Sequence, residues 1–325
     1  MRIYNKLKTS AVILLVVIVS MNLISCSSKK AENTDNLEIN IGYQFGTAYF
    51  PLEIIQINKI IEKNYPNTTI SWKQLGNTAA IREGMLSGDI DFGFMAIPPF
   101  LIGYDKGMNW KAFTGLSSVP SSLVVNSPSI NTLADFTAQD KIALPQQGSV
   151  QHILLSMAAD KAFNEPKKFD SMLLAMSHPD AMDILRTKNE IKGHFTTPPY
   201  TQMELKDKDM KIILESNEAF GEEFTFIIGA GKIENETDIK KVKILNEAIK
   251  DALIYIEANP EESAAIFSDK YNMTIPESKD FMNMEGVKFN QEIKGVNRFS
   301  EFMNKVEYIS KAYNEKEVIW DGYYD

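Results

Sequence analysis

Apolar residues recur along the chain after residue 36 with two periods, one typical of strands and one of helices. Leu37–Tyr43, Thr69–Trp72 and Ile90–Met95 alternate or run continuously apolar, as short buried strands do. Between them, Ile54–Tyr65 and Asn77–Ser87 carry apolar residues on one helical face. This strand–helix–strand–helix–strand order predicts a parallel sheet with helical crossovers.

A pair of prolines follows a strand at two places in the chain. Gly88–Tyr104 reads GDIDFGFMAIPPFLIGY, and Ile191–Tyr200 reads IKGHFTTPPY. Proline stops a strand but fits the first turn of a helix, so we expect helices from Phe100 and, capped by Thr197, from Pro198. Ligands of open α/β sheets bind at such carboxyl ends of strands. The two corners therefore suggest two lobes that share a cleft, although ordinary turn chemistry explains them equally well.

The middle of the chain repeats the strand–helix pattern. Strands are predicted at Lys141–Leu144, Ser171–Met176 and Met210–Leu214, and helices at Val150–Phe163 and Ala181–Thr187. These elements indicate a second α/β lobe.

Two extended apolar segments, Ser121–Asn126 and Phe224–Ile228, are predicted to carry the chain between the lobes. Residues 37–122 and 226–325 then form the first lobe, and residues 123–225 form the second. After the return crossing only helical patterns follow, and we expect a helical C-terminal tail packed on the first lobe. Its predicted helices span residues 239–258, 261–271, 276–284 and 296–313.

The N-terminus has the pattern of an export signal. The first ten residues, MRIYNKLKTS, are basic, and Ala11–Val19 is an apolar run too short to span a bilayer. The following LISC, which ends at Cys26, resembles the lipobox of bacterial lipoproteins, which implies cleavage before Cys26 and its lipidation. Residues 1–25 would be the signal peptide and 26–36 a flexible tether. The alternative is a plain secretory signal with an incidental cysteine.

Composition narrows the function further. The chain has 34 basic and 43 acidic residues, and loss of three basic residues with the signal changes the net charge from −9 to −9 − 3 = −12. Such a surface speaks against nucleic acid and favours a soluble monomer. Cys26 is the only cysteine, which excludes internal disulfides and cysteine-based zinc sites.

The histidines give little sign of a metal site. His152 would lie in the first turn of a helix, where it either donates to a ligand or is structural. His178 is interpreted as a surface turn residue, and His194 as a strand residue that alternation turns away from the cleft. No two are helix-spaced, so we expect neither a metal nor another cofactor.

Several motifs in a fixed order resemble one transport family. They are the lipobox, a first strand ending in GYQ, a loop and helix containing Gly46-Thr47, LSGDIDFGFMAIPP, SLVVNSPSINTLADF, KIALPQQGSVQHILL and IKGHFTTPPY. Together they resemble the substrate-binding lipoproteins of ABC importers for nitrate, sulfonates, taurine and pyrimidine precursors of thiamine, over residues 37–214. The resemblance implies a type II periplasmic-binding fold with two hinge crossings. It also implies an interlobe ligand site, an ABC permease and ATPase as partners, and a lipid anchor on the extracytoplasmic face.

The ligand-contacting segments of that family map onto four loops of this sequence. The second corner departs from the family, which often has a tryptophan or an acid where this chain reads HFTT, so the ligand stays open. The implied contacts are Gln44, Phe45, Gly46 and Thr47; Met95, Ala96 and Ile97; Gly148, Ser149, Val150 and Gln151; and Phe195, Thr196 and Thr197.

The chemistry of these loops restricts the ligand. They contain no Lys, Arg, Asp or Glu, which disfavours a free amine such as taurine, because a buried ammonium needs a partner. Gly148–Ser149 at a helix start could form an anion nest, or Ser149 could simply cap the helix. Aromatic residues near the loops suit a flat ligand. We expect a small neutral or monoanionic compound: a pyrimidine, an aromatic compound or an aliphatic sulfonate, with nitrate less favoured.

No catalytic motif stands out, so we do not expect an enzyme. The fungal pyrimidine-precursor synthases of the same fold carry a cysteine-rich iron motif, which a chain with one cysteine lacks. A lipoprotein that senses a ligand for a membrane receptor remains an alternative to transport.

Overall fold

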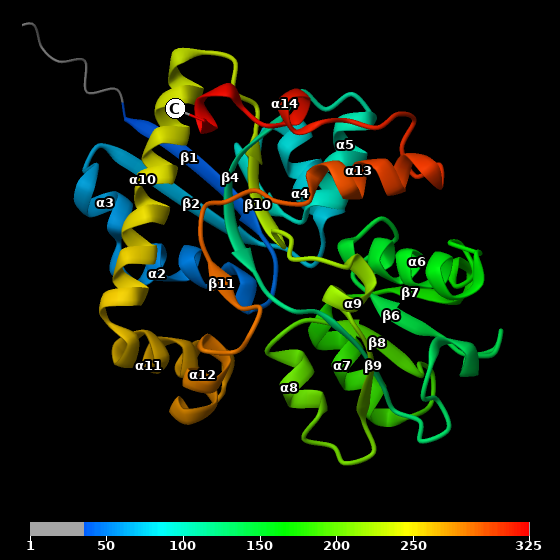
Figure 1. The fold of residues 1–325 in the computed structure, drawn as a ribbon. Helices are drawn as coiled ribbons and strands as arrows, with labels where there is room; N and C mark the ends of the chain where they lie inside the picture. Colours follow the sequence, from blue (N-terminus) through cyan, green and yellow to red (C-terminus); the bar gives the residue numbers. More distant parts are fainter. Residues whose placement is uncertain (1–35, 325) are drawn as a thin grey trace, which may run out of the picture. The chain divides into compact units, whose positions relative to one another are not determined.

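The computed structural model describes residues 36–324, so the predicted signal peptide, Cys26 and most of the predicted tether lie outside it. The described chain builds two β-sheets with helices on their faces (Figure 1). The first sheet has the order β11-β4-β10-β3-β1-β2. Its strands are β1 (Leu37–Tyr43), β2 (Thr68–Gln74), β3 (Phe92–Met95), β4 (Lys111–Ser118), β10 (Ile227–Gly231) and β11 (Lys288–Phe289).

The second sheet, drawn mainly in green in Figure 1, has the order β7-β6-β8-β5-β9. In each sheet the strand that enters from the other one, β10 or β5, is antiparallel to both of its neighbours. The predicted two-lobed α/β fold is therefore confirmed, and both lobes follow one plan. The strands are β5 (Ser122–Val125), β6 (Ile142–Leu144), β7 (Leu173–Ala175), β8 (Gly193–Thr196) and β9 (Lys211–Glu215).

Two connections join the sheets. The chain leaves the first sheet after Ser118 and enters the second at Ser122. It returns after Glu215 through a short helix and joins the first sheet again at Ile227. The segments predicted as crossings, 121–126 and 224–228, thus include strand residues of β5 and β10, and the linking residues are 119–121 and 221–226.

Helices cover both sheets and continue into the C-terminal part. With the first sheet lie η1 (Thr47–Tyr49), α2 (Phe50–Asn58), α3 (Ile60–Asn64), α4 (Thr78–Ser87) and α5 (Ile97–Asp105). With the second lie η2 (Leu133–Asp135), α6 (Val150–Phe163), η3 (Asp170–Met172), α7 (His178–Thr187), α8 (Tyr200–Glu204) and α9 (Ser216–Phe220). The tail has α10 (Glu236–Ala258), α11 (Pro260–Tyr271), α12 (Ile275–Met282), α13 (Val296–Lys305), α14 (Glu315–Val318) and η4 (Asp321–Tyr323).

Local backbone geometry corrects three predicted helix boundaries. The helix predicted over 54–65 is interrupted at Lys59, which is left-handed with φ 50°. Helix α5 starts at Ile97 rather than Phe100, because its prolines occupy the first turn. Thr197 is not an N-cap, since α8 begins at Tyr200 with Pro199 before it.

The tail contacts both lobes instead of the first alone. Helix α10 packs on α2 and α3, whereas α13 contacts α5 of the first lobe and α6 of the second (Figure 1). The helix predicted over 296–313 ends at Lys305, and Glu307 adopts φ 62°. This turn brings the Tyr308 hydroxyl to 3.0 Å from Ser156 Oγ on α6. Within residues 36–324, no helix has the length and apolarity to cross a membrane.

Candidate functional site between the two lobes

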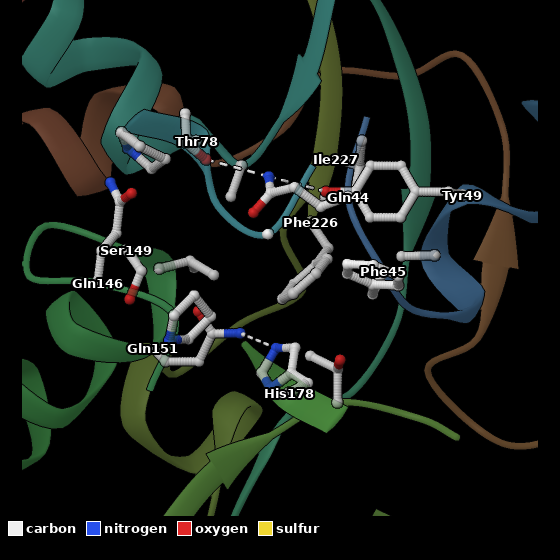
Figure 2. Close-up of a pocket in the computed structure, with 17 residues that line it drawn as sticks. Gln44, Phe45, Tyr49, Thr78, Gln146, Ser149, Gln151, His178, Phe226 and Ile227 are labelled. Atoms are coloured by element: carbon white, nitrogen blue, oxygen red, sulfur yellow. Dashed lines mark hydrogen bonds between the residues drawn. The ribbon is translucent and has the colours of Figure 1, made fainter. Parts of the chain in front are cut away.

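A small cavity lies where the strand ends of the two lobes face each other. Figure 2 shows Gln44 and Thr78 on one side of it, Gln151 and His178 on the other, and Phe226 between. The volume left between the side chains is about 30 Å³. The lining residues are Gln44, Phe45, Ala48, Tyr49, Gly76, Thr78, Ala96, Pro99, Pro145, Gln146, Ser149, Val150, Gln151, His178, Thr197, Phe226 and Ile227.

Direct hydrogen bonds hold the lobes together beside the cavity. The backbone N–H and the hydroxyl of Thr47 both donate to the carbonyl oxygen of Pro198, at 3.1 and 3.0 Å. On the other side, the N–H of Ala79 in the first turn of α4 donates to Oε1 of Gln146 at 2.9 Å. These contacts close the cavity, so a ligand larger than a water molecule or two requires the lobes or side chains to move.

The walls carry no fixed charge. None of the lining residues is Lys, Arg, Asp or Glu, and the titratable ones are Tyr49 and His178. Burial raises the pKa of Tyr49 and lowers the pKa of His178 well below its usual range, so both side chains are neutral near pH 7. The cavity therefore offers hydrogen bonds and apolar contact, but no ion pair.

Half of the residues expected at the ligand do line the cavity. These are Gln44, Phe45, Ala96, Ser149, Val150, Gln151 and Thr197. The other seven lie around it: Gly46, Thr47, Met95, Ile97, Gly148, Phe195 and Thr196. Met95, Ile97, Phe195 and Thr196 are completely buried in the lobes. Thr47 is turned toward Pro198, as described above.

Gln44 is fixed by two hydroxyl groups of the first lobe. Its Nε2 donates to Thr78 Oγ1 at 3.0 Å and to the Tyr49 hydroxyl at 3.1 Å (Figure 2). With both N–H groups used, the amide oxygen has no hydrogen bond within residues 36–324. Gln44 therefore presents an acceptor on the first-lobe wall.

The start of α6 is built differently from the predicted anion nest. Ser149 is the N-cap, and its hydroxyl accepts from the N–H of His152. The N–H of Gly148 donates to His152 Nδ1 at 2.9 Å, and that of Ser149 donates to Gln146 O at 3.1 Å. Both amides of the predicted nest are thus already satisfied. The first-turn amides of Val150 and Gln151 remain, because an α-helix has no internal acceptors for them.

His152 has a structural position behind this helix start. Because its Nδ1 accepts from Gly148, its Nε2 carries the proton and faces Asp170 Oδ1 at 3.0 Å. The Tyr308 hydroxyl of the tail approaches the same carboxylate at 3.3 Å. His152 therefore orders the α6 start instead of facing the cavity.

His178 contradicts its sequence interpretation, whereas His194 lies in strand β8 and does not line the cavity, as predicted. His178 is only 6% exposed and lines the cavity, so it is not a surface turn residue. Its Nδ1 lies 2.9 Å from Nε2 of His194, whose Nδ1 lies 2.5 Å from Oε1 of Glu204. His194 and Glu204 are completely buried. Within residues 36–324, no group of three or more His, Cys, Asp or Glu side chains is placed to hold a metal ion.

Other lining residues were not among the contacts predicted from the sequence. Tyr49 and Thr78 follow the first loop and the second strand, Gln146 precedes the predicted nest, and Phe226 and Ile227 belong to the return connection and β10. Loops at the carboxyl ends of parallel strands could have been scanned as one set, which would have included Thr78 and Gln146. The positions of His178 and Phe226 at the cavity depend on tertiary contacts, which no local sequence pattern reveals.

Comparisons with known proteins find similarity in structure alone, because no protein-family model and no curated protein matches the chain. The alkanesulfonate-binding protein SsuA from Xanthomonas axonopodis pv. citri, bound to MOPS, is 16% identical (TM-score 0.72; 87% of this chain, 98% of that one). The periplasmic aliphatic sulphonate-binding protein SsuA from Escherichia coli is 18% identical (0.66; 87% and 92%). The periplasmic nitrate-binding protein NrtA from Synechocystis PCC 6803 is 14% identical (0.67; 89% and 87%). The chain thus has the periplasmic-binding-protein fold, and these neighbours are of the classes that the sequence motifs resemble.

Proposed function

We propose that the protein is the extracytoplasmic solute-binding component of an ABC importer and that it binds a small neutral or monoanionic organic compound. The observation that carries this proposal is an interlobe cavity at the strand ends that is lined entirely by groups without fixed charge. The similar structures of sulfonate- and nitrate-binding proteins support the transport role. A permease and its ATPase would be the partners, and no catalytic step is proposed.

The polar groups of the cavity define the ligand class. A free ammonium would meet no carboxylate there, and an unpaired buried charge is costly. A single negative charge can be held by the first-turn amides of Val150 and Gln151, where the helix dipole is positive. The acceptor of Gln44 suits a ligand that also donates, and the rings of Phe45 and Phe226 suit a flat one. Aminopyrimidines and aromatic or aliphatic monoanions meet these requirements.

A ligand screen tests the proposal. We expect aminopyrimidines, sulfonates or benzoate to raise the melting temperature, because a ligand that binds only the folded state stabilises it. Ala96→Phe should weaken that binding by more than about 100-fold, since Ala96 lines the cavity and an added phenyl ring would occupy the space that the ligand needs. Calorimetric titration measures the loss.

The matched control is Ala258→Phe, which adds the same ring at an exposed position near the end of α10 and should bind normally. Ligand binding should also lower the radius of gyration of the protein in solution scattering, because the lobes must open for the ligand to enter and close on it afterwards. Tight binding of taurine alone, or equal affinity of the two phenylalanine variants, would contradict the proposed site.

We further propose that the mature protein starts at Cys26 and is held on the membrane by a lipid on that residue, with residues 27–36 as a tether. The order of a basic segment, an apolar segment and LISC motivates this proposal. Cys26→Ser is expected to leave the precursor uncleaved or to release the protein from the membrane. Detergent-phase partitioning and N-terminal mass measure the outcome, and unchanged partitioning of the serine variant would argue against lipidation.

A further inference from the structure

A buried hydrogen-bonded chain leads from the cavity into the second lobe. It runs from Gln151 on α6 to His178 at the start of α7, then to His194 on β8 and Glu204 at the end of α8. Gln151 and His178 line the cavity (Figure 2), whereas His194 and Glu204 have no exposed surface. The three links measure 3.4, 2.9 and 2.5 Å from the cavity inward.

This series of hydrogen bonds has only two arrangements in which both imidazoles are neutral, because each neutral ring has one N–H and one lone pair. If Glu204 is a carboxylic acid, it donates to His194 Nδ1, His194 Nε2–H donates to His178 Nδ1, and Nε2–H of His178 faces the cavity. If Glu204 is ionised, every bond reverses and Nε2 of His178 faces the cavity as an acceptor. The protonation of a residue deep in the lobe is thus expressed at the ligand site.

Burial selects the first arrangement near neutral pH. Oε2 of Glu204 is buried without a hydrogen-bond partner among the described residues, which is far more costly for a carboxylate than for an acid. Burial raises the pKa of Glu204 to about 9 and lowers the pKa of His194 to about 3.

Charged neighbours do not reverse this preference. Arg186 on α7 is the cation that lowers the pKa of Glu204, but its effect is smaller than that of burial, and its side chain is partly exposed. Tyr200 on α8 stacks on His178, with ring centroids 5.7 Å apart, and burial raises the pKa of its hydroxyl to about 12, with a smaller contribution from Glu53 on α2. From α6 the group facing His178 is the neutral amide of Gln151, whose Nε2 lies 3.4 Å from His178 Nε2. When His178 Nε2 carries the proton, this amide turns by 180° so that its Oε1 accepts from it.

We propose that His178, positioned by His194 and Glu204, selects ligands by donating its Nε2–H to a carbonyl oxygen, a ring nitrogen or a sulfonate oxygen in the cavity. Glu204 and His194 act as positioning residues, and ionisation of Glu204 turns the donor into an acceptor. This inference rests on the proposed binding function for its ligand, but the tautomer itself is a property of the protein alone. Gln44 on the opposite wall would select a donor on the same ligand.

The tautomer is tested first, without any ligand. Long-range ¹H–¹⁵N spectra of the imidazoles should show His178 protonated at Nε2 at pH 7. At about pH 10 the wild type should change to Nδ1 protonation, whereas Glu204→Gln should not, because the amide N–H of glutamine still donates to His194 and does not titrate. Glu257→Gln, at an exposed position on α10, is the control and should behave as wild type. Nδ1 protonation of His178 at pH 7, or identical pH behaviour of wild type and Glu204→Gln, would overturn the inference.

Binding is tested with ethanesulfonate and cytosine, which do not titrate between about pH 7 and 10. For whichever probe binds, the affinity of the wild type should fall about 10-fold between pH 7 and 10, because one hydrogen bond to the ligand is lost. The affinity of Glu204→Gln should stay constant over the same range. His178→Phe, which keeps a ring, should show the weaker affinity at every pH. If neither probe binds while the tautomer behaves as expected, the proposed ligand classes fail and the positioning of His178 stands. An equal loss of affinity in wild type and Glu204→Gln would refute the role of Glu204.

Discussion

Replacement of Gly115 by alanine is expected to destabilise the protein by about 3 kcal/mol or more. Gly115 lies in the middle of β4, and its N–H donates to the carbonyl oxygen of Gln291 at 2.9 Å. A Cβ on Gly115 would lie 1.9 Å from the backbone oxygen of Glu292. Since backbone atoms, unlike a flexible side chain, cannot rotate away, the segment that leads to α13 would have to leave the sheet. Equilibrium denaturation in urea measures the loss.

Gly76→Ala is the matched control for this substitution. Gly76 is exposed, and a Cβ there would meet no atom within 4 Å. The free energy of unfolding of Gly76→Ala should therefore stay within about 0.5 kcal/mol of the wild-type value. Equal stability of the two alanine variants would show that the contact between β4 and the Gln291–Glu292 segment does not constrain the fold.

The sequence predicts most of the fold because its periodic segments are also packed segments. Val150–Phe163 is helical over the predicted range, since Ser149 caps one end and left-handed Asn164 ends the other. The helix predicted over 296–313 shows the opposite case. Val306, Ile309 and Tyr313 continue the apolar helical spacing and are indeed buried, but in the irregular segment that follows the helix. Tyr313 N–H donates to Ser300 Oγ, a tertiary contact that periodicity does not reveal.

The candidate site was predictable only where it follows strand ends. Gln44, Ala96, Ser149 and Thr197 come directly after strands or before helices, so the fold brings them together. His178 was missed because Ser177-His178-Pro179-Asp180 has the composition of a surface turn. The N-cap is indeed there, with Ser177 accepting from the N–H of Asp180. His178 is buried by tertiary contacts, with His194, 16 positions away, and with the stacked ring of Tyr200, and no local pattern encodes them.

The stability of the protein is expected to decline above neutral pH because of Glu204, and Glu204→Gln should remove this decline. The folded-state pKa of Glu204 is about 9, whereas the ordinary value is 4.5. The folded state therefore binds more protons than the unfolded state between these values, and stability falls as the pH rises through that window. His194, whose pKa is lowered to about 3, acts with the opposite sign, because the unfolded histidine takes up a proton below about pH 6.5. Above pH 6.5, Glu204 is thus the member of the pair that changes stability.

The measurement is the difference in unfolding free energy between Glu204→Gln and wild type, from urea denaturation at steps between pH 5 and 10. Above pH 6.5, where His194 is neutral in the folded and the unfolded state, the difference isolates Glu204, because the other titrating groups are common to both chains. It should grow in favour of the variant as the pH rises from 4.5 toward 9, by at most about 1.4 kcal/mol per pH unit. Glu257→Gln, which removes an exposed carboxylate from α10, should give a nearly flat difference. A flat difference for Glu204→Gln as well would mean that Glu204 is ionised in the folded protein at neutral pH, and that His194 then carries its proton on Nδ1.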